Sequence, residues 1–304
     1  MATQPLSGVV PVIQTPFGAN GAIDADALER ELHWVLDQGV QGLTTGMVSE
    51  ILRLDETERR ELGRLVTTVA HERSALSILS CGAETTRQSI HFATHAAALG
   101  ADAVMVTPPT TVSLGEAATF DHFVAIARAS ELAIVVQDAS AYVGQPLSVA
   151  LQARLFETLG DQIYFKPEAP PLGQRLSQLR DATHGAARTF EGTAGVNLVD
   201  AFQRGVVGSM PGAEVCWAVA AMWRSLTTNN VEQATRINAY LALLVNVQTS
   251  LDSYIAVEKH LLWRQGVLPS ADVRGPSGYQ LDGETCKEVD RLLELLQRIT
   301  FDEV

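Results

Sequence analysis

Short apolar segments alternate along the chain with longer segments in which apolar residues recur at helical spacing. Most short segments are continuously apolar, which is typical of strands buried on both faces of a parallel sheet. We expect eight strands, over Val9–Gln14, Gly42–Thr45, Leu76–Cys81, Ala103–Thr107, Ala133–Asp138, Gln162–Lys166, Arg188–Glu191 and Val206–Met210.

The longer segments carry the residues that start and stop helices. Asp24, Asp55 and Thr85 stand at expected N-caps, and Gly100 and Gly160 stand near expected ends. We expect helices over Asp24–Gln38, Glu56–His71, Thr85–Leu99, Glu116–Ala129, Ser148–Leu159, Leu172–Ala182, Leu198–Arg204, Glu214–Leu226, Val231–Ser250, Leu251–Gln265 and Gly283–Ile299.

The alternation of strand and helix predicts a (β/α)₈ TIM barrel, because eight such units fit into roughly 210 residues. An open doubly wound sheet is the alternative. Such a sheet would have about six strands and often a glycine-rich loop after the first strand. The segment at that position is Thr15-Pro16-Phe17-Gly18, which is not a glycine-rich loop, so we favour the barrel. The 304 residues then divide into a barrel that holds the active site, residues 1–225, and a C-terminal helical region, residues 226–304.

The acidic composition narrows the range of partners. The net charge of −13, from 35 acidic and 22 basic residues, argues against binding to nucleic acid or to anionic lipid. We expect no signal peptide and no membrane span, because no basic and apolar leader and no long uncharged apolar segment occur. The three cysteines form no CxxC motif, which favours reduced thiols and a cytoplasmic protein.

Lysine is scarce, and one of the three lysines stands where a barrel carries its chemistry. Lys166 ends the apolar segment Ile163-Tyr164-Phe165, at the carboxyl end of the sixth strand. Burial there would favour the neutral amine, which can attack a ketone to form a Schiff base. A lysine that reaches solvent from the strand end is the alternative. Lys259 and Lys287 lie on expected C-terminal helices, where we expect them to be solvated.

A set of motifs accompanies Lys166 along the chain. They are Thr15-Pro16-Phe17, Gly46 and Glu50 followed by Leu54 and Glu58, Gly100-Ala101-Asp102-Ala103, Pro108, Gly192, Gly205 and Gly208, Lys259 with Gly266, and Arg274-Gly275-Pro276. Through these residues the chain resembles the dihydrodipicolinate synthase and N-acetylneuraminate lyase superfamily of Schiff-base aldolases and lyases over nearly its whole length. Lys166 falls at the Schiff-base position of that superfamily.

Departures from the family pattern narrow the resemblance. Met47 and Val48 replace two threonines, Gln137 replaces the tyrosine that relays protons, and Asp138 replaces an asparagine. Tyr142 stands where the synthase has an arginine that clamps a second carboxylate. The pattern is most similar to the 2-keto-3-deoxypentonate dehydratase branch, of which the L-2-keto-3-deoxyarabonate dehydratases are the nearest match.

The resemblance implies site residues as well as a fold. Lys166 would form the Schiff base, with Gln137, Asp138 and Glu168 as further catalytic candidates. The amides of Val48 and Ser49 and the Ser49 hydroxyl would hold the substrate carboxylate. Gly192, Met210 and Glu50 complete the expected substrate site. For Asp138 and Glu168, a structural role and a catalytic role are equally compatible with the sequence. For Glu50 we favour a structural hydrogen bond to the loop backbone, and for the side chain of Met210 we expect packing.

We therefore expect a lyase that dehydrates a 2-keto-3-deoxy sugar acid, without a metal or another cofactor. A retro-aldolase that releases pyruvate, and a pyrroline-4-hydroxy-2-carboxylate deaminase, would use the same lysine. A barrel that binds a keto acid without catalysis is the third hypothesis. His91 and His95 have the i, i+4 spacing of metal ligands, but we expect them on a surface helix face. The family implies a homo-oligomer, a tetramer or a dimer.

Overall fold

Eight parallel strands form a nearly closed barrel in the computed structural model, which describes residues 5–140 and 145–301. Neighbouring strands pair in the order β1-β8-β7-β6-β5-β4-β3-β2. The strands are β1 Gly8–Val9, β2 Gly42–Thr44, β3 Leu76–Ser80, β4 Ala103–Val106, β5 Ala133–Gln137, β6 Ile163–Lys166, β7 Arg188–Glu191 and β8 Gly208–Ser209. The (β/α)₈ fold predicted from the alternation is confirmed.

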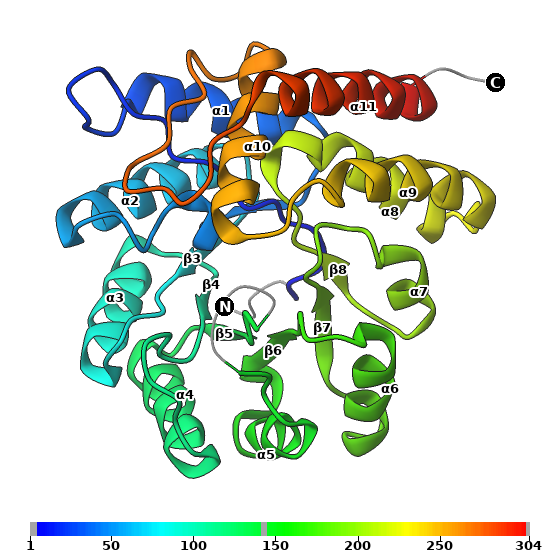
Figure 1. Ribbon diagram of the computed structural model, residues 1–304. Coiled ribbons are helices and arrows are strands. Elements are labelled where there is room, and N and C mark those ends of the chain that lie inside the picture. Colours follow the sequence, from blue (N-terminus) through cyan, green and yellow to red (C-terminus); the bar gives the residue numbers. More distant parts are fainter. Residues whose placement is uncertain (1–4, 141–144, 302–304) are drawn as a thin grey trace.

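The helices surround the strands and then continue on one side of the barrel (Figure 1). The outer helices are α1 Ala25–Asp37, α2 Glu56–Glu72, α3 Thr86–Leu99, α4 Glu116–Ser130, α5 Val149–Leu159, α6 Leu172–Ala182, α7 Leu198–Gln203 and α8 Cys216–Thr227. The C-terminal helices are α9 Val231–Val245, α10 Leu251–Arg264 and α11 Gly283–Phe301. Among the described residues, no helix combines the length and the hydrophobicity needed to cross a membrane.

The expected N-caps start the first three helices. The side chains of Asp24, Asp55 and Thr85 accept hydrogen bonds from backbone amides three residues later. Each such bond satisfies an amide that the helix itself leaves without a partner. Asp55 also forms a capping box with Glu58.

The first strand is shorter than the sequence pattern predicts. We expect Val9–Gln14, but the ladder of β1 covers only Gly8–Val9, because Pro11 has no amide hydrogen to donate. The chain still continues along both neighbours, since Val12 forms isolated bridges with Thr44 and with Gly212. These bridges bring the loops after β1, β2 and β8 together.

The inside of the barrel is filled with side chains. One cluster of buried residues contains Val10, Met105, Val135, Tyr164 and Phe190, each from a different strand or its extension. A second cluster lies between the strands and the helices α1 to α5. The interior is therefore a packed core, and open space for a substrate must lie above it, at a strand end.

Helix α10 covers that end of the barrel. It packs against two short 3₁₀ turns, η1 Met47–Ser49 after β2 and η3 Ala213–Val215 after β8. A part of the C-terminal helical region thus lies directly beside the loops in which a barrel carries its chemistry. The domain boundary at residue 225 stays a prediction.

Candidate active site

Residues on or directly after seven of the eight strands, and two residues of α10, line one small cavity. Gln137 and Lys166 are the last residues of β5 and β6, are partners in the strand register and are each 4% exposed. The cavity measures about 30 Å³ and is lined by Val12, Gly46, Met47, Val48, Met105, Gln137, Lys166, Gly192, Ala194, Met210, Pro211, Gly212, Tyr254 and Glu258. Five of the predicted site residues therefore meet here: Val48, Gln137, Lys166, Gly192 and Met210.

Lys166 does not extend into solvent but contacts a carboxyl group. Its Nζ donates to Oε1 of Glu168, and Nε2 of Gln137 donates to the same oxygen at 2.7 Å. Burial raises the pKa of Glu168, and the charge of Lys166 opposes this rise. An amine and a carboxyl group in contact can exchange a proton, which is what formation and hydrolysis of a Schiff base require.

Asp138 holds the loop that carries Glu168. Its carboxylate accepts hydrogen bonds from the amides of Glu168 at 3.1 Å and of Ala169 at 3.4 Å, and from Ser140. The side chain is 2% exposed but does not line the cavity. In this arrangement Asp138 fixes the position of Glu168 rather than facing the space where a substrate would bind.

Ser49 and Glu50 use their side chains within the protein. The Ser49 hydroxyl donates to the carbonyl of Ile13 and accepts from the amide of Gly46 at 3.0 Å. The Glu50 carboxylate accepts from Lys259 Nζ at 3.0 Å and from the amide of Arg274 at 3.2 Å. Of the residues in this turn, Met47 and Val48 line the cavity, and Ser49 and Glu50 do not.

Gly192 allows the close approach of β7 to the lysine. A Cβ at this position would lie 2.9 Å from Cγ of Lys166 and 3.0 Å from Cγ of Glu168. The preceding residue, Glu191, is fully buried and accepts from the amides of Thr193 and Gly195 and from the Ser209 hydroxyl. The β7 loop is thus held in place beside Lys166.

The expectation that Lys259 is solvated was wrong. Lys259 is 0% exposed, its Nζ pairs with Glu50, and it lies 4.4 Å from the centre of the Phe17 ring. Burial lowers its pKa, and the charge of Glu50 opposes this change. Helical spacing does not show which residues a helix packs against. Two adjacent charged residues, Glu258 and Lys259, inside the apolar stretch of α10 are a sequence signal that could have indicated buried charges with partners elsewhere in the chain.

Sequence reasoning also missed Glu258, which precedes Lys259 on α10 and lines the cavity. Its carboxylate accepts a hydrogen bond from Nε2 of Gln14, at the end of the first strand segment. These residues are 244 positions apart, and no local pattern links them. His91, in contrast, contacts Glu56 on the outer surface as expected for a surface histidine.

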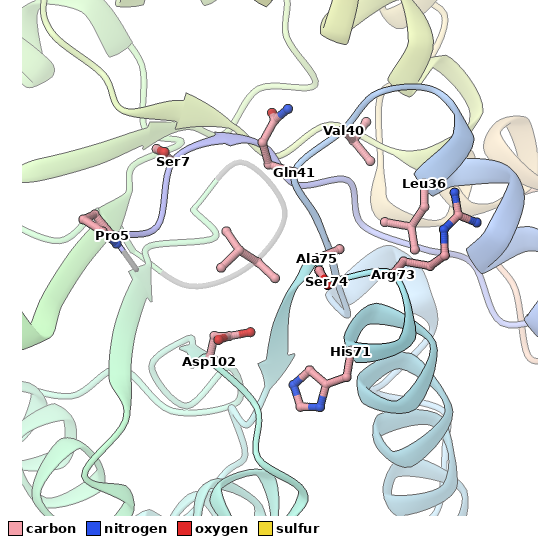
Figure 2. Close-up of a pocket in the computed structure, with 11 residues that line it drawn as sticks. Pro5, Ser7, Leu36, Val40, Gln41, His71, Arg73, Ser74, Ala75 and Asp102 are labelled. Atoms are coloured by element: carbon pink, nitrogen blue, oxygen red, sulfur yellow. The ribbon is translucent and has the colours of Figure 1, made fainter. Parts of the chain in front are cut away.

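A larger pocket, about 470 Å³, lies at the opposite end of the barrel (Figure 2). Its lining includes Gln41, Leu76 and Asp102, which stand at the amino ends of β2, β3 and β4. None of the predicted site residues lines it. Because barrel enzymes carry their chemistry at the carboxyl ends of the strands, the small cavity at Lys166 is the candidate active site. Tyr142 lies outside the described residues.

Comparison with known proteins places this geometry in context. The model of the dihydrodipicolinate synthetase family matches residues 5–295. An L-2-keto-3-deoxyarabonate dehydratase of Azospirillum brasilense is 27% identical over 278 residues, which cover 88% of each chain. An uncharacterized DapA-like lyase of Halobacterium salinarum is 34% identical over 176 residues, and this match spans 57% of that protein and 56% of this chain.

The fold is also that of solved structures. The 4-hydroxy-tetrahydrodipicolinate synthase of Methylacidiphilum fumariolicum superposes with a TM-score of 0.87 over 97% of each chain, at 24% identity. At this level of identity the match shows the shared fold alone.

Proposed function

The chain belongs to the dihydrodipicolinate synthetase family, whose members are lyases, and from this premise we propose that it dehydrates a 2-keto-3-deoxy sugar acid through a Schiff base on Lys166. The substrate would be of the L-2-keto-3-deoxyarabonate type. The observation that carries the proposal is the buried contact of Lys166 with Glu168, beside Gln137. The similarity to the Azospirillum dehydratase over 88% of the chain supports the choice of reaction.

The proposed reaction begins with proton transfer from Lys166 to Glu168, which leaves a neutral amine. The amine adds to the C2 carbonyl of the substrate, and water leaves as the protonated imine forms. The imine withdraws electrons, so that a C3 proton is released and an enamine forms. The electron pair of the enamine expels the hydroxyl group at C4, which takes up a proton and leaves as a second water molecule. The conjugated imine that remains loses a proton from C5, and the resulting enol becomes an aldehyde as protons return to C4 and C3. Hydrolysis of the imine then releases the semialdehyde and the free amine of Lys166.

The other predicted residues would bind and orient the substrate. The backbone amide at Val48 would donate a hydrogen bond to the C1 carboxylate, whereas the Ser49 amide already donates to the carbonyl of Gly46 at 3.0 Å within the turn. Gly192 and Met210 would border the reacting carbons. Gln137 would orient a substrate hydroxyl or a water molecule, because an amide exchanges no proton at neutral pH. Asp138 and Glu50 would hold the loops around the substrate. We also propose that the protein is a homo-oligomer located in the cytoplasm.

Covalent trapping tests the proposal. The protein is incubated with pyruvate or with L-2-keto-3-deoxyarabonate and reduced with borohydride, and the modified peptide is identified by mass spectrometry. We expect an adduct on Lys166 and 2-oxoglutarate semialdehyde as the product. Pyruvate as a product from the sugar acid would indicate the retro-aldolase instead, and release of ammonia from a hydroxypyrroline carboxylate would indicate the deaminase.

The variant Lys166→Ala provides the control for trapping. It should lose both the adduct and turnover, while its far-ultraviolet circular dichroism and its thermal unfolding stay those of a folded barrel. Absence of an adduct on the unmodified protein would exclude every lyase hypothesis and leave the keto-acid-binding barrel.

A further inference from the structure

Three buried glutamates from separate elements meet beside the active site. We call Glu31, Glu214 and Glu258 the glutamate cluster. They come from α1, η3 and α10 and are 0%, 1% and 2% exposed. Gln14 links two of them: its backbone amide donates to Glu31 Oε1 at 2.7 Å, and its side-chain amide donates to Glu258 Oε2. The mechanism outlined above uses none of these residues.

The cluster brings carboxyl groups close together without enough hydrogen-bond donors. A Cβ on Gly212 would lie 2.2 Å from Oε2 of Glu214 and 2.8 Å from Cδ of Glu258, so a glycine is required for these carboxyl groups to approach. Oε2 of Glu31 and Oε2 of Glu214 are buried and have no hydrogen-bond partner among the described residues. Carboxylates in such an enclosure cannot all be ionised, because like charges repel and burial removes water.

The charged groups that face the cluster do not neutralise it. Lys259 is near Glu31 but pairs with Glu50, and Lys166 faces Glu258 but contacts Glu168. Burial, followed by the charge of Glu214, raises the pKa of Glu258 well above its usual range. Burial also raises the pKa of Glu214 to about 7 and that of Glu31 to about 8.

Glu258 is the member of the cluster that reaches the active site. It lines the same cavity as Lys166 and Gln137. The side chain of Gln137 is an amide, which carries no proton at neutral pH, and Asp138 is bound to the loop amides. Glu168 accepts two hydrogen bonds from Lys166 and Gln137 on one oxygen. A second proton carrier is needed for the departing hydroxyl, and Glu258 has the required position.

We propose that Glu258 is a catalytic acid of the site and that Gln14, Glu31 and Glu214 are positioning residues that hold it as a neutral carboxyl group. Glu258 gives its proton to the C4 hydroxyl as the C4–O bond breaks, and water leaves. The C3 proton leaves in the preceding step and is held by the Glu168 carboxylate beside Lys166. It then returns the Glu258 carboxylate to its neutral form, so that no net proton is consumed. This inference rests on the proposed dehydration and adds the source of its proton.

The variant Glu258→Gln tests the assignment, since glutamine keeps the size of the side chain and an oxygen that accepts from Gln14. We expect kcat for the sugar acid to fall by about 100-fold or more, with KM changed less than threefold. The borohydride adduct with pyruvate should still form on Lys166, because that step precedes loss of the C4 hydroxyl. Glu258→Asp should recover a part of kcat, and Glu288→Gln, on the exposed face of α11, should keep full activity.

The pH profile gives an independent measurement through Glu214→Gln. A catalytic acid works only while it is protonated, so kcat falls as the pH rises through its pKa. Removal of the neighbouring negative charge lowers that pKa, and we expect the alkaline limb of the kcat profile to move to lower pH. This measurement also applies if Glu258→Gln does not fold.

Several results would overturn the inference. A folded Glu258→Gln variant with kcat within threefold of the unmodified protein would do so, as would loss of the pyruvate adduct in that variant or an alkaline limb that Glu214→Gln leaves unmoved. Failure of the unmodified protein itself to form the adduct would refute the proposed function instead.

Discussion

Glu168 receives two hydrogen bonds on the same carboxylate oxygen, from Lys166 and from Gln137, while its other oxygen is buried without a partner among the described residues. This asymmetry suits an acceptor that takes the proton of Lys166 and is then ready to return it. Burial raises the pKa of Glu168, which makes its carboxylate a better acceptor for the proton of Lys166.

Replacing Glu168 by glutamine should therefore slow Schiff-base formation itself. We expect the rate of adduct formation with pyruvate to fall by about 100-fold, because an amide takes no proton from the ammonium group of Lys166. Time-resolved borohydride trapping measures this rate. Glu157→Gln, on the exposed face of α5, is the control and should react at the normal rate. Equal rates in the two variants would show that Glu168 has only a structural role.

Gly192→Ala is expected to disturb the same pair through space alone. The added Cβ would lie 2.9 Å from Cγ of Lys166 and would displace the middle of the side chain, not its flexible end. We expect kcat to fall at least 10-fold with little change in thermal unfolding. Gly283→Ala is the matched control, since a Cβ there meets no atom within 4 Å. Normal kcat in Gly192→Ala would mean that the strand end adapts to the methyl group.

Helix α10 has two roles on neighbouring positions. Glu258 faces the active-site cavity, and Lys259 faces the turn after β2, where it pairs with Glu50. Since the Glu50 carboxylate also accepts from the amide of Arg274, it joins three distant parts of the chain. The position of α10 over the cavity thus depends on a buried ion pair.

Lys259→Met should show how much this ion pair contributes. Removal of one partner leaves the other charge buried, which costs about 3–5 kcal/mol of unfolding free energy. The double variant Lys259→Met with Glu50→Gln should recover a part of the loss, because no uncompensated charge remains. Urea denaturation measures both. Lys287→Met, on an exposed lysine of α11, should change the stability by less than about 0.5 kcal/mol, and an equally small effect at Lys259 would contradict the prediction.

The sequence predicts the elements better than the contacts between them. The strands β4, β5 and β6 follow from continuous apolar segments, and α1 to α3 begin at the predicted caps, because both properties are local. Lys166 is also found by its position at a strand end. Glu258 and the partner of Lys259 are not, because these contacts join residues 209 to 244 positions apart and depend on how α10 packs over the barrel.

The molecule as a whole carries an acidic interior as well as a net charge of −13. The glutamate cluster joins α1, the turn η3 after β8, and α10, so its protonation affects both the barrel and the C-terminal helical region. A buried acid whose pKa is raised on folding binds more protons in the folded state than in the unfolded chain. The free energy of unfolding therefore decreases as the pH rises through the folded-state pKa.

The pKa of Glu31 sets the pH range over which the free energy of unfolding should decrease. Burial raises its pKa from 4.5 to about 8, so its contribution is fully present below pH 4.5 and is lost as the pH rises towards 8. The loss is of the order of a few kcal/mol, since one pKa unit corresponds to about 1.4 kcal/mol. Glu214, with a pKa raised to about 7, adds to the same slope.

Glu31→Gln should flatten this slope, because glutamine keeps an oxygen that accepts from the Gln14 amide but does not ionise. We expect urea denaturation between pH 5 and pH 8.5 to show a steep decline for the unmodified protein and a shallower one for the variant. The difference should be largest at the alkaline end, where the variant becomes the more stable protein. Glu29→Gln, two residues earlier on the exposed face of α1, is the matched control and should keep the original slope. Parallel curves for Glu31→Gln and the unmodified protein would show that Glu31 is not held protonated in the fold.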